Sequence, residues 1–127
     1  MAGEFIADSV LDDGVQYAVT NGSRIDITSQ AATTYTEATS TYTLGNKTSL
    51  TLTGPSNASS GTGRAAVVPA ITDGSVTGTD TATHWALSDG SSELLATGPL
   101  TSSQAVTSGN TFTLDSIEVI NRDATVT

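Results

Sequence analysis

The segment TATHWAL at residues 81–87 decides the fold class, because its side chains alternate between two kinds. Successive side chains on a β-strand point to opposite faces, so alternation predicts a strand here. One face is Thr83, Trp85 and Leu87, and the other is Ala82, His84 and Ala86. The small residues of the second face predict that it also lies against protein. Asp89-Gly90 follows as a tight-turn signal, and ELLAT at residues 93–97 is the expected return strand.

The same alternation recurs along the chain. We expect further strands at residues 15–20, 24–29, 48–53, 64–68, 100–106 and 111–120. Turn signals lie between them at Asn21-Gly22, Gly45-Asn46 and Asp73-Gly74, and the first of these predicts a hairpin. Short strands separated by frequent turns are typical of a sandwich or barrel. The predicted fold is therefore all-β: a single-domain β-sandwich, jelly-roll or immunoglobulin-like, with short strands and little helix.

Two segments depart from this pattern. Residues 31–40 contain Thr34 and Glu37 at the spacing of a helix-capping box, which predicts one helical turn. Residues 54–63 are rich in Gly, Ser and Pro, and we expect an exposed loop there.

The last expected strand contains a shift of phase. Phe112 and Leu114 share one face by strict alternation, whereas Ile117 and Val119 fall on the other. A β-bulge near Asp115-Ser116 would return all four side chains to one face. Pro69 lacks a backbone N–H, so the strand at residues 64–68 either is an edge strand or ends there.

The chain divides into three parts: residues 1–13 as an N-terminal arm or edge strand, 14–120 as the sandwich domain, and 121–127 as a polar tail. The apolar residues of the arm are able to add a strand to a neighbouring protein. Together with Trp85, they are the expected interface: Phe5, Ile6, Val10, Leu11 and Trp85.

The charge of the chain argues against several partners. The formal net charge is −9, with only four Lys and Arg residues. Nucleic-acid binding draws its affinity from Lys and Arg contacts to phosphate, so we expect neither nucleic acid nor an anionic membrane as a partner. Residues 1–9 lack the basic and apolar regions of a signal peptide, and we expect synthesis in a cytoplasm.

Residues suited to catalysis are few. His84 is the only histidine and there is no cysteine, so we expect a hydroxyl-bonded His84 on a strand, no metal site and no cofactor. Asp12-Asp13 is the only adjacent carboxylate pair, and a turn or strand end explains it better than glycoside hydrolysis. Trp85 is either a core residue or a platform for a ligand. The sequence predicts a protein that is not an enzyme.

Several stretches together resemble small β-rich virion proteins of tailed bacteriophages. They are TYTEATSTYTLG at residues 34–45, THWALSDG at 83–90, LLATGPL at 94–100 and SGNTF at 108–112. A chain of this size is similar to the capsid decoration, or cement, proteins of that class. The resemblance covers most of the chain, and its motifs are structural.

The resemblance implies a non-enzymatic virion structural protein that is made in the host cytoplasm and decorates the capsid through protein–protein contacts. Its partners would be the major capsid protein or another virion protein, and we expect a homo-oligomer with a trimer favoured. The alternatives are a tail- or fibre-associated virion protein, or a carbohydrate-binding adhesive β-sandwich that uses Trp85 for stacking.

Overall fold

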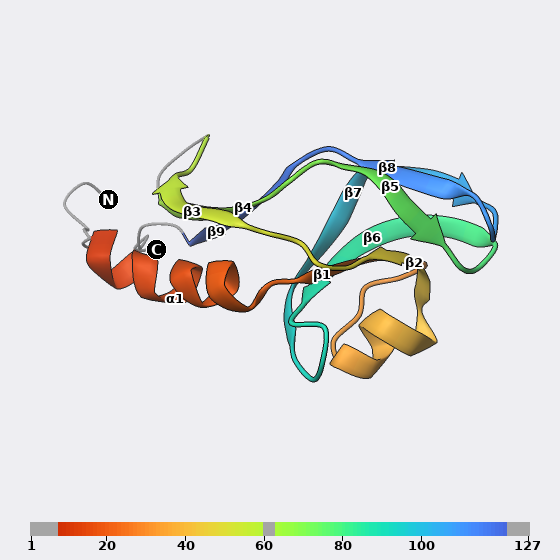
Figure 1. Cartoon of the computed structure of the whole chain (residues 1–127), viewed down its shortest axis with the longest axis horizontal. Coiled ribbons are helices and arrows are strands. Elements are labelled where there is room, and N and C mark those ends of the chain that lie inside the picture. The colour runs from red at the N-terminus through yellow and green to blue at the C-terminus, as the bar shows by residue number, and fades with distance from the viewer. Residues whose placement is uncertain (1–7, 60–62, 122–127) are drawn as a thin grey trace, which may run out of the picture.

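The computed structural model describes residues 8–59 and 63–121, which form two antiparallel sheets and a helix (Figure 1). The elements are α1 (Asp8–Asn21), β1 (Arg24–Thr28), η1 (Glu37–Thr41), β2 (Thr43–Lys47), β3 (Thr53–Asn57), β4 (Arg64–Val68), β5 (Ile71–Val76), β6 (Asp80–Ser88), β7 (Leu94–Val106), β8 (Thr111–Leu114) and β9 (Ile117–Asn121). Six strands form a curled sheet in the order β7-β6-β1-β2-β5-β8, and three form the sheet β3-β4-β9. The predicted all-β class is confirmed.

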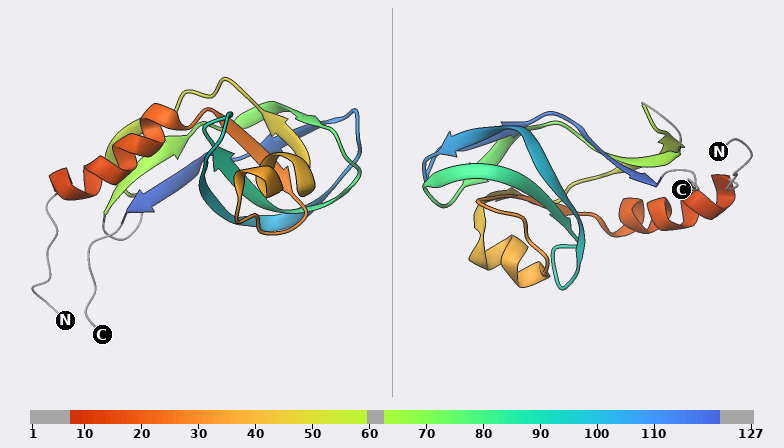
Figure 2. Two further views of the ribbon diagram at one scale, coloured as in Figure 1. Left: turned by 90° about the horizontal axis from the view of Figure 1, so that it is seen from below. Right: turned by 180° about the vertical axis from the view of Figure 1, so that it is seen from behind.

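Helix α1 occupies residues 15–20, for which the sequence predicted a strand, so that prediction is wrong. Val15 and Ala18 are buried and Val19 packs against the core, whereas Tyr17 is 51% exposed. Spacings of three and four residues define a helix face, and the alternation of Val15, Tyr17 and Val19 is incidental to it. Figure 2 shows α1 lying along the three-stranded sheet, away from most of the curled sheet.

The pair Asn21-Gly22 ends this helix, and the predicted hairpin is wrong. The Asn21 amide donates to the Tyr17 carbonyl (2.9 Å), and the Gly22 N–H donates to the Ala18 carbonyl (2.8 Å). A Cβ at Gly22 would lie 2.7 Å from the Ala18 carbonyl oxygen, so the chain needs glycine here.

The helix also changes the predicted division of the chain. It runs through residues 13 and 14, where we expected the arm to meet the domain, and residues 8–13 are not an edge strand. Residues 1–7 and most of the expected tail, 122–127, lie outside the described part of the chain.

The strands predicted around Trp85 and at residues 24–29, 64–68 and 93–97 are confirmed as β6, β1, β4 and the start of β7. Two predicted turns are wrong, because Gly45-Asn46 lies inside β2 and Asp73-Gly74 inside β5. Gly45 is needed for a close approach instead: a Cβ there would lie 2.4 Å from the Ser75 carbonyl oxygen.

The region between residues 31 and 63 follows the predictions only in part. The helical turn is confirmed as η1, where the Glu37 N–H donates to the Thr34 hydroxyl (3.1 Å). Residues 48–52 form no strand, although Leu52 is buried, and β3 takes up part of the predicted loop.

One long antiparallel ribbon joins the two sheets. In the small sheet Val68 of β4 lies opposite Ile117 of β9, and in the curled sheet Ile71 of β5 lies opposite Leu114 of β8. The register is therefore kept across a two-residue break in each chain segment, and it shifts only beyond the break, between Ile71 and Gly74 of β5. Figure 1 shows this ribbon running from β4 and β9 into β5 and β8.

The break in the ribbon is where the sequence predicted a change of phase. Asp115 and Ser116 are both exposed and belong to no strand, while Phe112 and Leu114 before them are buried. Ile117 after them packs against the same core, so the expected return to one face is confirmed. The predicted bulge is wrong, because residues 115–116 lie opposite an equal number of residues, 69–70, and the register does not shift there. On the facing segment β4 ends directly before Pro69, also as expected.

Strand β1 lies inside the curled sheet and is buried on both faces. Ile25 and Ile27 belong to the main core, while Asp26 and Thr28 point to the opposite face. A second, smaller core covers part of that opposite face. It consists of Ala32, Ala38 and Ala86, with Tyr42 and Leu94 packed against them. The prediction that the small-residue face of β6 lies against protein is confirmed at Ala86.

A buried ion pair completes this second layer. Asp26 is fully buried and accepts two hydrogen bonds from Arg24, at 2.8 and 2.9 Å, and one from the Thr43 hydroxyl at 2.7 Å. The hydrogen bond to Asp26 raises the pKa of Arg24 above its ordinary value. Arg24 also donates to the Thr39 carbonyl of η1 (3.5 Å), which ties the helical turn to the sheet.

The turn between β6 and β7 is held by one carboxylate. Asp89 accepts backbone hydrogen bonds from Ser92 (2.8 Å), Glu93 (3.0 Å) and Ser91 (2.9 Å). These donors stabilise the charged form and lower the pKa of Asp89 to about 2. The predicted Asp89-Gly90 turn is confirmed.

Removing the buried carboxylate should destabilise the fold strongly. We expect Asp26→Ala to lower the free energy of unfolding by about 3 kcal/mol, because it empties a fully buried site and leaves the half-buried Arg24 and the Thr43 hydroxyl without their shared partner. Urea denaturation measures the change. Asp73→Ala is the matched control: Asp73 pairs with Lys47 at the surface (3.0 Å), and its loss should cost less than about 1 kcal/mol. Equal costs for the two variants would contradict the role given to Asp26.

A side chain at Gly74 should also lower the free energy of unfolding. A Cβ at Gly74 would lie 2.3 Å from the ring of the buried Phe112, so Gly74→Ala must displace that ring. We expect a loss of about 1 to 3 kcal/mol in unfolding free energy. Gly78→Ala, whose added Cβ meets only ordinary contacts from 3.4 Å, should change it by less than about 0.5 kcal/mol. A tolerated Gly74→Ala would show that the ring has room to move.

Candidate functional site

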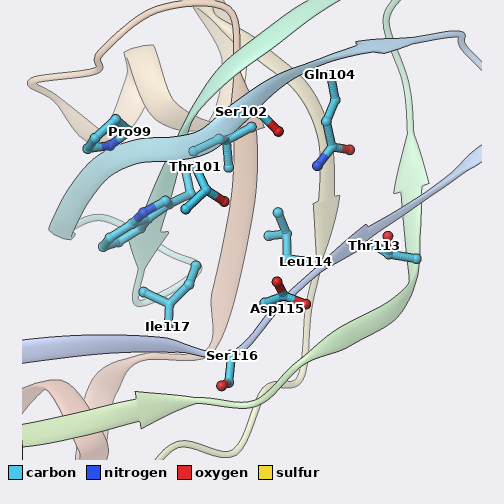
Figure 3. A pocket seen from close by; sticks show the side chains of 11 residues that line it. Pro99, Thr101, Ser102, Gln104, Thr113, Leu114, Asp115, Ser116 and Ile117 are labelled. Carbon is cyan, nitrogen blue, oxygen red and sulfur yellow. The ribbon is translucent and has the colours of Figure 1, made fainter. Parts of the chain in front are cut away.

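The curled sheet leaves a seam between its two outer strands, β7 and β8. A cavity of about 490 Å³ lies in this seam. Its walls are residues 99–102 and Gln104 of β7, residues 113–117 of β8, the break and β9, and Trp85 of β6. Figure 3 shows Thr101, Ser102 and Gln104 on one side of the space and Leu114, Asp115 and Ile117 on the other.

An irregular stretch of β7 forms one wall. Ala82 lies opposite Gln104 and His84 lies opposite Pro99, so residues 100–103 of β7 face a single residue of β6. Extra residues on one strand form a bulge, which bends that strand and redirects its side chains. The bulge brings the polar residues of β7 to the seam.

The break in the ribbon forms the other wall. Asp115 and Ser116 connect β8 to β9 where the chain passes from the curled sheet to the small one. The cavity therefore lies where two irregularities, one in each outer strand, face one another.

Trp85 belongs both to the core and to the cavity. Its side chain is half-buried, packs against the main core and lines the cavity. Its partner on β7 is Gly98, where a Cβ would lie 2.7 Å from the indole Cζ2 atom. The ring therefore covers a bare stretch of backbone and is held in place by it. The two alternatives for Trp85, core residue and ligand platform, do not exclude one another in this fold.

The polar side chains around the cavity are not used by the fold. None of them makes a side-chain hydrogen bond to another residue within the ranges 8–59 and 63–121. They are Thr101, Ser102, Gln104, Thr113, Asp115 and Ser116. Some hydroxyls elsewhere are engaged, as in the bonds of Thr43 to Asp26 and of Thr83 to the Ser29 carbonyl. The cavity thus presents donors and acceptors that remain available to a ligand.

Those residues of the expected interface that the structure describes lie in two parts of the fold. Phe5 and Ile6 lie outside the described residues, and Val10 and Leu11 lie in the N-terminal half of α1, beside the small sheet. Trp85 lies on β6 of the curled sheet. The sequence therefore grouped residues from two different parts of the fold.

The residues considered for catalysis have structural roles. The Nδ1 atom of His84 lies 2.8 Å from the Thr83 hydroxyl, as expected for a hydroxyl-bonded histidine. Asp12 lies in α1, not in a turn or strand end, and pairs with Arg64 of β4 at 2.8 Å. Within the described ranges, no three His, Asp or Glu side chains group as metal ligands, and no helix has the length and apolar character to cross a membrane.

Sequence reasoning missed most of the cavity. Trp85 was considered as a platform for a ligand, and the change of phase at Asp115-Ser116 predicted a bulge, but neither signal predicted a site in the seam. The polar run Thr101-Ser-Ser-Gln104 carries no mark that distinguishes it from the many Thr- and Ser-rich stretches of this chain.

A methyl group at Gly98 should push the indole into the cavity. We expect Gly98→Ala to shift the Trp85 emission to longer wavelength and to raise its quenching by acrylamide. The added methyl group would displace the indole from the Gly98 backbone and expose more of it to solvent. Trp85 is the only tryptophan, so the emission reports this site alone. Gly78→Ala should leave the emission and the quenching unchanged. An unchanged spectrum in Gly98→Ala would contradict the placement of the ring.

Comparisons with known proteins add no family to this description. No family model, no curated protein and no solved structure matches the chain.

Proposed function

We propose that this protein is a non-enzymatic structural component of a tailed-phage virion, and that it decorates the capsid surface through protein–protein contacts as a homo-oligomer. The observation that carries the proposal is the outer edge of β9. A strand edge presents rows of backbone N–H and C=O groups, and a neighbouring chain adds to such an edge by strand pairing.

Strand β9 has the features of an edge that receives a partner. Over residues 117–120 it pairs with β4 on one side, and no strand of the described chain pairs on the other. Ile117, Val119 and Ile120 are apolar and half-buried in this edge strand. An apolar hollow of about 200 Å³ lies between Ile120 and α1, and it includes Val15 and Val119. Partner side chains that filled this hollow would bury the exposed parts of these residues.

The position of the N-terminus supports the same surface. Helix α1 packs on β3, β4 and β9, so the described chain begins beside the small sheet. Phe5 and Ile6 come just before it in the sequence and are able to extend the contact with a neighbour. The acidic charge of −9 suits a basic or neutral protein surface.

A capsid repeats the same binding surface many times, so a weak contact with each copy is enough for stable attachment. Many identical contacts between a symmetric oligomer and a repeated capsid surface give high avidity even if each contact is weak. We propose a trimer, in keeping with the resemblance to capsid decoration proteins. The same β9 edge would serve a tail or fibre protein, which is the alternative location within the virion.

Co-sedimentation with capsids tests the proposal directly. The purified chain is mixed with tailed-phage capsids that lack their decoration protein, and its solution mass is measured by light scattering. We expect saturable binding at a fixed ratio per capsid subunit and a mass three times that of one chain. Binding to isolated tails in place of capsids would favour the alternative, and binding to neither would contradict a virion role.

Two sets of variants locate the contact. Ile120→Lys places a charge on the β9 edge and should weaken capsid binding at least about tenfold, because charged residues on an edge oppose strand pairing. Thr81→Lys adds the same charge at an exposed position of β6 and should bind like the unmodified chain. Phe5→Ala and Ile6→Ala test the contribution of the N-terminal segment. Thermal unfolding of each variant separates lost binding from lost structure.

A further inference from the structure

We infer that the cavity in the seam between β7 and β8 is a binding site for a neutral saccharide, of the size of one or two hexose units. This site goes beyond the proposed role in the virion and does not depend on it, because it lies on the curled sheet and not on the β9 edge.

The apolar part of the cavity suits a sugar ring. Pyranose rings have faces made of C–H groups, and such faces pack on the flat surface of an indole. Trp85 lines the cavity and is fixed by its contact with Gly98, so little side-chain freedom is lost when a ligand binds. Leu114 and Ile117 supply aliphatic surface on the facing wall.

The polar part suits the hydroxyls of the same ring. Thr101 and Ser102 offer hydroxyls, Gln104 offers an amide and Asp115 a carboxylate, and they reach the space from β7 on one side and from the break between β8 and β9 on the other (Figure 3). Each sugar hydroxyl is both a donor and an acceptor, which matches this mixed set. None of these four side chains is hydrogen-bonded within the described structure, so binding breaks no bond of the fold.

The charge of the cavity selects against other ligands. Asp115 is the only ionisable group in its lining, and the whole chain carries −9. Phosphate, nucleotides and acidic sugars would be repelled, because the lining contains no Lys or Arg. A purely apolar ligand would bury the Asp115 carboxylate and the Gln104 amide without hydrogen bonds, which is unfavourable.

The size of the cavity agrees with this choice. Its volume of about 490 Å³ falls within the roughly 300–1,000 Å³ of small-molecule sites, and it combines a few polar groups with an aromatic wall, as such sites do. One or two hexose units fit this space.

Tryptophan fluorescence of the full chain tests the inference. The probes are lactose, maltose and cellobiose, with 3′-sialyllactose as the acidic counterpart. We expect at least one neutral disaccharide to change the Trp85 emission in a saturable way, and saturation-transfer NMR to show contacts from its ring protons. The sialylated probe should bind more weakly than lactose, because of its repulsion by Asp115.

Matched variants place the ligand. Asp115→Asn should raise the Kd about tenfold, because it removes a charged acceptor, and Ser102→Ala about threefold. Ser103→Ala lies in the same bulge but does not line the cavity, and Asp13→Asn makes the same charge change on the exposed face of α1. Both controls should bind like the unmodified chain.

Three results would overturn the inference. The first is no change in emission or NMR signal with any of the neutral disaccharides. The second is binding that Asp115→Asn and Ser102→Ala leave unaltered. The third is saturable quenching by an extended Thr/Val-rich peptide when all saccharides are silent, which would assign the seam to a partner strand. Capsid co-sedimentation of Asp115→Asn should be normal, so failure here leaves the role of β9 untouched.

Discussion

The rest of the structure depends on the register that β4 and β5 keep with β9 and β8 at the point where the chain passes from one sheet to the other. Val68 faces Ile117 in one sheet and Ile71 faces Leu114 in the other, so two residues on each side are bridged without a shift in pairing. This constraint forces both segments to leave the first sheet and enter the second together. It separates a small sheet covered by α1 from a curled sheet whose outer strands do not meet, and it leaves Asp115 and Ser116 exposed beside the seam.

Alternation predicted the strands well where the two faces of a strand have different surroundings. It was correct for β6, where Leu87 enters the main core and Ala86 the second one, and for the change of phase before Ile117. It failed for α1, because Val15, Tyr17 and Val19 satisfy a period of two while Val15, Ala18 and Val19 satisfy a helix. Gly14 within the helix and the following Asn21-Gly22 also made a strand and a hairpin the natural prediction there. The seam could not be predicted, because it is created by the curvature of a whole sheet and by a bulge that has no local signature.

The two proposed surfaces divide the molecule by chemistry. The small sheet offers an apolar strand edge beside α1, which suits a protein neighbour, and the curled sheet offers a polar cavity with a single fixed aromatic ring, which suits a small uncharged ligand. Other polar side chains are hydrogen-bonded within the fold and stabilise it, above all Asp26 with Arg24 and Thr43. A chain with few large apolar residues thus gains a second layer by burying one ion pair and a cluster of alanines.

With so few large side chains, two of the aromatic rings pack directly on glycine backbone. Phe112 lies over Gly74 and Trp85 lies over Gly98, each ring resting on the bare backbone of the neighbouring strand. In evolutionary terms these are coupled positions. A larger residue at either glycine is compatible only with a smaller residue at the facing aromatic position, so the two members of each pair should change together or not at all. Homologues that diverge elsewhere, including at the surfaces that bind partners, should therefore retain Gly74 with Phe112 and Gly98 with Trp85 as two linked pairs.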